Sequence, residues 1–188
     1  MAAKPLRADA ERSVRAILDA AQRVLSANPA ASMEQIAEAA GVARTTVHRR
    51  FANREALLRA MGLWAWQRVK EAIEAARPMT APPMVAMHQA TANVLAVKDS
   101  WTFALDNADA ADPETAAVRE EVAALRDNAF AAARDVGIFA PDVDLAWLAR
   151  VYVALISESV HGQEEAGDPD VLATRVIDTL LHGFGPRS

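Results

Sequence analysis

Apolar residues recur at three- and four-residue spacing along nearly the whole chain, which is the period of an amphipathic α-helix. The first such segment covers about residues 9–27, where Val14, Ile17, Leu18 and Leu25 form one stripe. Further helices are predicted at about residues 32–41, 43–51, 53–76, 84–97, 101–108, 113–136, 142–161 and 170–183. The sequence shows no strand-like alternation, so the pattern predicts an all-α protein.

The breaks between these segments carry helix start and stop signals. Asn28-Pro29 ends the first helix, and Ser32 with Gln35 three residues later predicts a capping box at the start of the second. Gly41 ends the second helix, because glycine readily takes the left-handed conformation of a helix terminus. The longest break is RPMTAPPM, residues 77–84, which contains three prolines.

The stretch SMEQIAEAAGVARTTVHRRFANR, residues 32–54, reads as two short helices joined by a glycine turn. Val47 and Phe51 lie four residues apart on one face of the second of these helices, where they would pack inward. The opposite face presents hydrogen-bond donors that reach base edges and phosphates, namely Arg44, Thr45, His48 and Arg49. The stretch therefore predicts a helix-turn-helix that reads DNA.

The longer stretch IAEAAGVARTTVHRRFANREALLRAM resembles the signature of the tetracycline-repressor (TetR) family, and the resemblance covers about residues 14–61. It implies an N-terminal three-helix DNA-binding domain, residues 1–55. It also implies a C-terminal helical ligand-binding and dimerisation domain, residues 56–188. Two residues depart from the family pattern: His48 stands where Tyr is usual, and Ala43 replaces a small polar residue that could cap the helix.

The resemblance also implies DNA contacts for matching residues. Arg44, Thr45 and His48 would face bases, and Thr46, Arg49 and Arg54 would contact phosphates, while Ser32 and Met33 would lie near the DNA backbone. The alternative interpretation is that these polar residues form an ordinary solvated face.

The charge distribution supports the DNA-binding interpretation. The 188 residues have a net charge of −5, yet residues 1–59 hold ten Lys/Arg and six Asp/Glu, a net charge of +4. The remaining residues have a net charge of −9. The sequence has no Cys, no signal-peptide pattern and no apolar run of about 18 residues, so we expect a cytoplasmic protein without a membrane segment.

The C-terminal part supplies candidates for a dimer interface and for a ligand pocket. The predicted interface on the last two helices consists of Leu148, Tyr152, Leu155, Ile156, Val176, Thr179, Leu180 and Gly183. The predicted pocket for a small apolar ligand is lined by Trp64, Met87, His88, Trp101, Phe103, Phe130 and Trp147. The alternative for both sets is burial in the core of the monomer.

Two other functions compete with DNA binding. The chain could be a helical interaction module, or a metal-dependent enzyme that uses the Glu158–His161 pair. A second such pair, a phosphate-binding glycine loop and common hydrolase motifs are missing from the sequence, so we predict no enzyme activity, no metal and no cofactor. The sequence favours a homodimeric repressor that binds a palindromic operator in double-stranded DNA and is released by a small-molecule effector.

Overall fold

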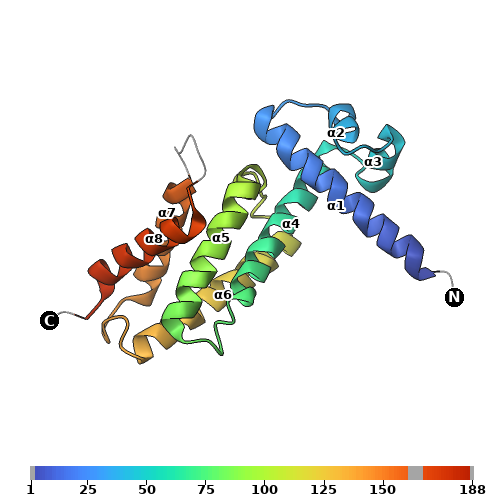
Figure 1. Cartoon of the computed structure of the whole chain (residues 1–188). Helices are drawn as coiled ribbons and strands as arrows, with labels where there is room; N and C mark the ends of the chain where they lie inside the picture. Colours follow the sequence, from blue (N-terminus) through green and yellow to red (C-terminus); the bar gives the residue numbers. More distant parts are fainter. Residues whose placement is uncertain (1–2, 161–166, 187–188) are drawn as a thin grey trace. The chain divides into compact units, whose positions relative to one another are not determined.

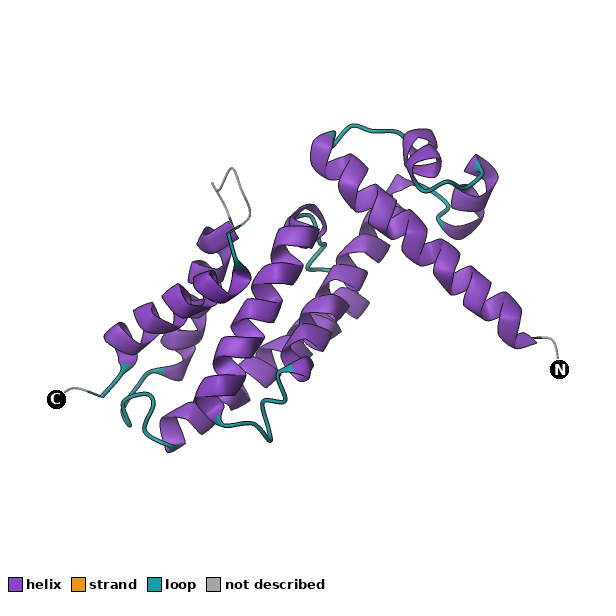
Figure 2. Cartoon of the chain, in the orientation of Figure 1, coloured by secondary structure: helices purple, strands orange, loops and turns teal. Residues whose placement is uncertain are grey.

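Every regular element in the part of the chain that the structure describes is an α-helix (Figures 1 and 2). The structure is a computed structural model that describes residues 3–160 and 167–186. Its helices are α1 (Ala3–Ala27), α2 (Met33–Ala39), α3 (Arg44–Arg50), α4 (Arg54–Ala75), α5 (Pro83–Asp106), α6 (Pro113–Asp135), α7 (Leu145–Val160) and α8 (Pro169–Phe184). The all-α prediction is confirmed.

The chain divides into two compact units, neither of which is one continuous segment. Unit 1 consists of Met1–Ala65 and Trp101–Thr115, and unit 2 consists of Trp66–Ser100 and Ala116–Ser188. The predicted boundary after residue 55 therefore differs from this division, since the break in the N-terminal segment lies ten residues further on, inside α4. The sequence pattern also gave no sign that residues 101–115 return to the N-terminal unit.

The core of unit 1 joins α1 to the two short helices and to the start of α4. Ile17 and Leu25 from α1, Ile36 from α2, Val47 from α3 and Leu57 from α4 are each completely buried. In Figure 1, α1 runs past both α2 and α3. These apolar contacts fix the two short helices, which are each too short to be stable alone.

The core of unit 2 is built around a group of aromatic rings. The Phe130 ring makes edge-to-face contacts with Phe139 and Tyr152, at centroid separations of 6.0 and 5.3 Å. The Tyr152 hydroxyl lies 3.2 Å from Thr91 Oγ1, which donates to the Met87 carbonyl. Burial raises the pKa of the Tyr152 hydroxyl.

The two helices predicted at residues 84–97 and 101–108 are arms of one kinked helix, α5. Trp101 takes non-helical backbone angles, φ −126° and ψ 23°. Within unit 1, the backbone N–H of Ala104 donates to Gln22 Oε1 on α1 at 3.2 Å. A kink interrupts the helical hydrogen bonds. The Gln22 side chain accepts from the Ala104 N–H, three residues after the kink at Trp101.

Among the helices described, none is long and apolar enough to cross a membrane.

Candidate nucleic-acid interface

The N-terminus of α2 is held by the capping box that the sequence predicted. The Ser32 hydroxyl accepts a hydrogen bond from the Gln35 backbone N–H at 3.3 Å, and the Gln35 side chain accepts one from the Ser32 N–H at 2.8 Å. At the other end, Gly41 has φ +66°, a conformation that favours glycine. These two features define where α2 begins and how the chain turns toward α3.

Helix α3 presents the face that the sequence predicted. Val47 is completely buried and Phe51 is nearly so, and both belong to the core of unit 1. The side chains predicted to meet DNA from the opposite face are all exposed, namely Arg44, Thr45, His48 and Arg49. Thr46 and Met33 are half-buried, and Ser32 is exposed. The helix therefore has a buried apolar side and an accessible side of hydrogen-bond donors.

No side chain caps the N-terminus of α3. Ala43 occupies the N-cap position with extended backbone angles, φ −65° and ψ 144°, and supplies no side-chain hydrogen bond. The sequence predicted that Ala43 leaves this helix without a side-chain cap, and the structure confirms it. By contrast, Asn53 Oδ1 accepts from the Ala56 N–H at 2.8 Å and caps α4 as expected.

Arg44 has a partner that the sequence analysis missed. Its guanidinium group forms an ion pair with the Glu34 carboxylate of α2, at an N–O distance of 2.7 Å. Hydrogen bonds from the Glu34 backbone and from Ser32, followed by the charges of Arg44 and His48, lower the pKa of Glu34. A ten-residue separation across a turn has no fixed helical spacing, so only the angle between α2 and α3 brings this pair together.

Arg54 lies at the start of α4 and is half-buried. Its guanidinium group donates to the backbone carbonyl of Ala31 at 2.6 Å and to that of Pro29. Both carbonyls belong to the turn between α1 and α2. A phosphate contact for Arg54 stays a prediction, while its hydrogen bonds in the free protein are made to the protein backbone.

The residues predicted to line one apolar pocket are divided between the two units. In unit 1, Trp64, Trp101 and Phe103 pack against the core, and Arg15 lies over the Trp64 ring at 5.4 Å. An aromatic residue at helical spacing looks the same in a core as in a pocket, so the sequence pattern does not distinguish the two.

In unit 2, two more of the predicted pocket residues, Met87 and Phe130, are core residues that are almost fully buried. Trp147 is 50% exposed on α7, with Arg150 over its ring. Of the seven residues, only His88 lines the cavity of about 360 Å³ between α5 and α8. A ligand site that uses these residues stays a prediction.

This cavity combines an apolar lining with a few polar groups. It is lined by Met84, Val85, His88, Gln89, Thr174, Ile177, Asp178 and Leu181. His88 Nε2 lies 3.0 Å from the Thr174 hydroxyl. The cavity is open to solvent, so a small molecule in it would stay partly exposed.

The residues predicted for the dimer interface divide between the core and the surface of unit 2. Leu148, Ile156, Val176 and Leu180 are buried among residues of their own chain, and they are unavailable to a partner. Their burial favours the alternative of a monomer core for these four residues, because the sequence pattern does not show which apolar stripe faces that core. Tyr152 and Leu155 are half-buried, and Thr179 and Gly183 are exposed.

Other apolar side chains on α7 and α8 do reach the surface. Trp147 and Val153 on α7 are 50% and 47% exposed, and Val171 on α8 is 48% exposed. Val153 lies one residue after the predicted apolar stripe of its helix and Val171 one residue before that of the next, so the periodicity does not point to either.

The Glu158–His161 pair is described only in part. Glu158 is exposed on α7, and His161 lies outside the described residues. Among the side chains that the structure describes, no three His, Asp or Glu residues gather in a way that could hold a metal ion.

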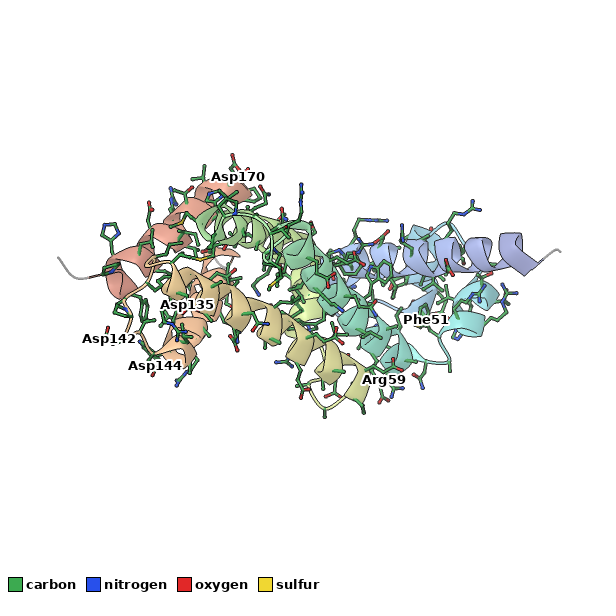
Figure 3. The ribbon with its side chains drawn as sticks, turned by 90° about the horizontal axis from the view of Figure 1, so that it is seen from below. Phe51, Arg59, Asp135, Asp142, Asp144 and Asp170 are labelled. Carbon is green, nitrogen blue, oxygen red and sulfur yellow. The ribbon has the colours of Figure 1, made fainter. Side chains whose placement is uncertain are left out.

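The acidic character of the C-terminal part is visible at the surface of unit 2. Asp135, Asp142 and Asp144 lie at the same end of this unit, around the connection between α6 and α7 (Figure 3). The exposed basic side chains of α3 belong to unit 1. These acidic side chains and the basic side chains of α3 therefore lie in different units.

The capped α2, the glycine turn and the half-exposed α3 define a helix-turn-helix DNA-binding protein. Residues 17–61 match the family described as "Bacterial regulatory proteins, tetR family". The chain is 31% identical over 176 residues to the HTH-type transcriptional repressor LfrR of Mycolicibacterium smegmatis, a match that covers 93% of this chain and 91% of LfrR. The chain belongs to the tetR family of bacterial regulatory proteins and is a DNA-binding transcriptional regulator.

Solved structures of family members share the fold over nearly the whole chain. The crystal structure of LfrR from Mycobacterium smegmatis in complex with proflavine has a TM-score of 0.71 and 29% identity, covering 94% of this chain and 99% of LfrR. PfmR from Thermus thermophilus has a TM-score of 0.76 and 17% identity, covering 92% of this chain and 99% of PfmR. The similarity to PfmR concerns the fold alone.

Proposed function

We propose that the protein is a homodimeric cytoplasmic repressor that binds a palindromic operator through α3 of each subunit and is released by a small-molecule effector. The observation that carries the DNA-binding part is the two-sided character of α3. Its Val47–Phe51 side is buried in unit 1, while Arg44, His48 and Arg49 are exposed. A short helix fixed in this way can enter the major groove without rearrangement.

The proposed contacts follow the exposed face of α3. Arg44, Thr45 and His48 read base edges, and Arg49 and Thr46 contact phosphates, with Ser32 and Met33 beside the DNA backbone. The net charge of +4 in residues 1–59 supports this orientation, because phosphate repels the acidic remainder of the chain.

The central experiment selects an operator from a random double-stranded library with the wild-type protein and measures its affinity over a salt series. We expect a log–log slope of about −0.9 for each phosphate contact. Arg44→Ala should lose about 1–3 kcal/mol of binding to the operator and discriminate less against a scrambled duplex. Arg134→Ala, which removes an arginine paired with Asp135 in unit 2, is the control.

Two results would contradict the DNA-binding proposal. One is the failure of wild-type protein to select any sequence. The other is an affinity that does not change with salt, which would favour a helical interaction module instead.

Dimer formation through α7 and α8 is supported by the exposed apolar side chains of these helices. Trp147, Val153 and Val171 are each about half exposed, and monomeric proteins rarely leave large apolar patches in water. Two reading units related by a two-fold axis would match the two halves of a palindrome.

The proposed effector is a small aromatic cation that binds in the cavity between α5 and α8. Met84, Ile177 and Leu181 supply apolar surface, and the Asp178 carboxylate supplies a negative charge. LfrR, the 31% identical relative, has a structure in complex with proflavine, which is a planar aromatic cation. The effector would stabilise a conformation of the dimer that fits the operator poorly.

Proflavine is therefore the first probe for effector binding. We expect it to bind the protein and to lower operator affinity, and we expect Asp178→Asn to weaken proflavine binding by about tenfold. Asp170→Asn changes an exposed aspartate of the same helix that does not line the cavity, and it should bind proflavine like wild type. Equal proflavine affinity of Asp178→Asn and wild type would contradict this site.

A further inference from the structure

We propose that Arg54 is a positioning residue that sets the start of α2, and through α2 the DNA-reading surface, by bonding to the turn between α1 and α2. This inference rests on the proposed operator binding. Its basis is the pair of hydrogen bonds from the Arg54 guanidinium to the carbonyl oxygens of Ala31 and Pro29. They join the first residue of α4 to backbone 23 and 25 residues earlier in the chain.

The turn that Arg54 contacts leads directly into functional residues. The Ala31 carbonyl is followed by Ser32, which caps α2, and by Met33, a proposed neighbour of the DNA backbone. Glu34 comes next and forms the ion pair with Arg44 of α3. A shift of this turn would therefore move the α2 cap and also the partner of a base-reading arginine.

The turn has only short-range hydrogen bonds of its own. The Ala30 N–H donates to Asn28 Oδ1 at 3.1 Å, and the Ala31 N–H donates to the Asn28 carbonyl at 3.0 Å. These bonds shape the turn but do not connect it to another helix. The buried Ala31 methyl group and the Arg54 guanidinium anchor it to the rest of unit 1.

The chemistry requires arginine in particular. Two carbonyl oxygens of one turn need two donors held in fixed directions. The planar guanidinium group supplies such donors. A lysine ammonium keeps the charge but is a single point donor on a flexible stem. Hydrogen bonds from a charged donor are roughly twice as strong as neutral ones, so two of them can define the position of a turn.

This geometry separates a positioning role from a phosphate contact. A residue that only neutralises phosphate would tolerate lysine, and its loss would weaken binding to all DNA while reducing the salt slope. A positioning residue would not tolerate lysine. Its loss would lower affinity for the operator without changing the salt slope.

The experiment compares Arg54→Lys and Arg54→Met with wild type, at a temperature where circular dichroism shows each variant folded. Affinity is measured for the selected operator and for a scrambled duplex of equal length, over a salt series. We expect both variants to lose on the order of tenfold in operator affinity. Binding to the scrambled duplex and the salt slope should stay at wild-type values, and Arg59→Lys, an exposed arginine of α4 (Figure 3), is the control.

Amide hydrogen exchange of the free protein provides a readout that does not depend on DNA. Both Arg54 variants should exchange faster than wild type at residues 31–35, whereas Arg59→Lys should not. Unchanged exchange at these amides would overturn the proposal, because the turn would then keep its position without Arg54.

The DNA measurements can overturn the proposal in two further ways. A direct phosphate contact would be identified instead by two results together. Arg54→Lys would bind the operator as tightly as wild type, and Arg54→Met would show a salt slope reduced by about one. If wild-type protein selects no operator, the proposed function fails and the DNA part of this inference fails with it. The exchange data would still decide whether Arg54 anchors the turn.

Discussion

At the scale of single residues, the DNA-reading face is controlled by residues that are not expected to touch a base. Glu34 forms an ion pair with Arg44 at 2.7 Å, although both side chains are largely exposed. In the proposed complex with DNA, Arg44 would share its donors between this carboxylate and a base edge. The carboxylate would also repel nearby phosphates, so we expect Glu34 to restrain binding to DNA of any sequence.

We predict that Glu34→Gln raises affinity for the scrambled duplex by roughly threefold, because it removes the restraint on Arg44. The ratio of operator affinity to scrambled-duplex affinity should therefore fall. Fluorescence anisotropy with both duplexes would measure the two effects. Glu38→Gln, at an exposed position of the same helix, is the matched control. Weaker binding of Glu34→Gln to the scrambled duplex would contradict this role of Glu34.

At the scale of elements, two helices have unusual features. Helix α3 lacks a side-chain cap, and the kinked helix α5 accepts support from α1. Ala43 leaves the N-terminal N–H groups of α3 without a side-chain partner. Gln22 on α1 accepts from the Ala104 N–H beyond the kink of α5, and it also donates to Ser26 at 3.0 Å. These two positions give opposite expectations for stability.

We predict that Ala43→Ser raises the free energy of unfolding by about 1 kcal/mol, since serine at an N-cap accepts a bond from the first turn of the helix. The extended backbone of Ala43 already suits a capping residue. Urea unfolding followed by circular dichroism would measure the change. The control is Ala52→Ser, which makes the same substitution at an exposed loop residue. The same stability for both variants would exclude a capping effect at α3.

We predict that Gln22→Leu lowers the free energy of unfolding by about 1–3 kcal/mol, because the buried Ala104 N–H loses its acceptor. Gln22 is only 6% exposed, so water cannot readily replace the side chain. The neighbouring change Arg23→Leu affects an exposed position of α1 and should have a much smaller effect in the same urea experiment. An unchanged midpoint for Gln22→Leu would mean that the kink needs no support from α1.

At the scale of the whole molecule, the proposed function depends on the association of two subunits. The exposed apolar residues of α7 and α8 are the surface proposed for this contact, and Val153 lies among them at 47% exposure. A charge at Val153 would be desolvated if this residue lies in the dimer contact, which opposes dimer formation.

We predict that Val153→Glu weakens the dimer by at least about tenfold and lowers operator affinity in parallel. Analytical ultracentrifugation over a range of concentrations would measure the first effect. Val136→Glu is the matched control, because Val136 is 62% exposed in the turn after α6 and belongs to neither α7 nor α8. Equal dimer stability of the two variants would place the interface elsewhere.

The sequence by itself determined the helices, the helix-turn-helix and its exposed face. Capping residues such as Ser32 and Asn53, the turn at Gly41 and the Val47–Phe51 pair act over three or four residues. Interactions of this range are encoded in residue order, because helix geometry converts fixed spacing into fixed neighbours.

Only the tertiary structure decided which apolar stripe is core, where the units divide and what Glu34, Arg54 and Gln22 contact. Leu148 and Val153 look alike in sequence, yet one is completely buried and the other is half exposed. The Arg54 and Gln22 hydrogen bonds span 23 to 82 residues of chain. No local spacing encodes such contacts, because they depend on how helices pack after each has formed.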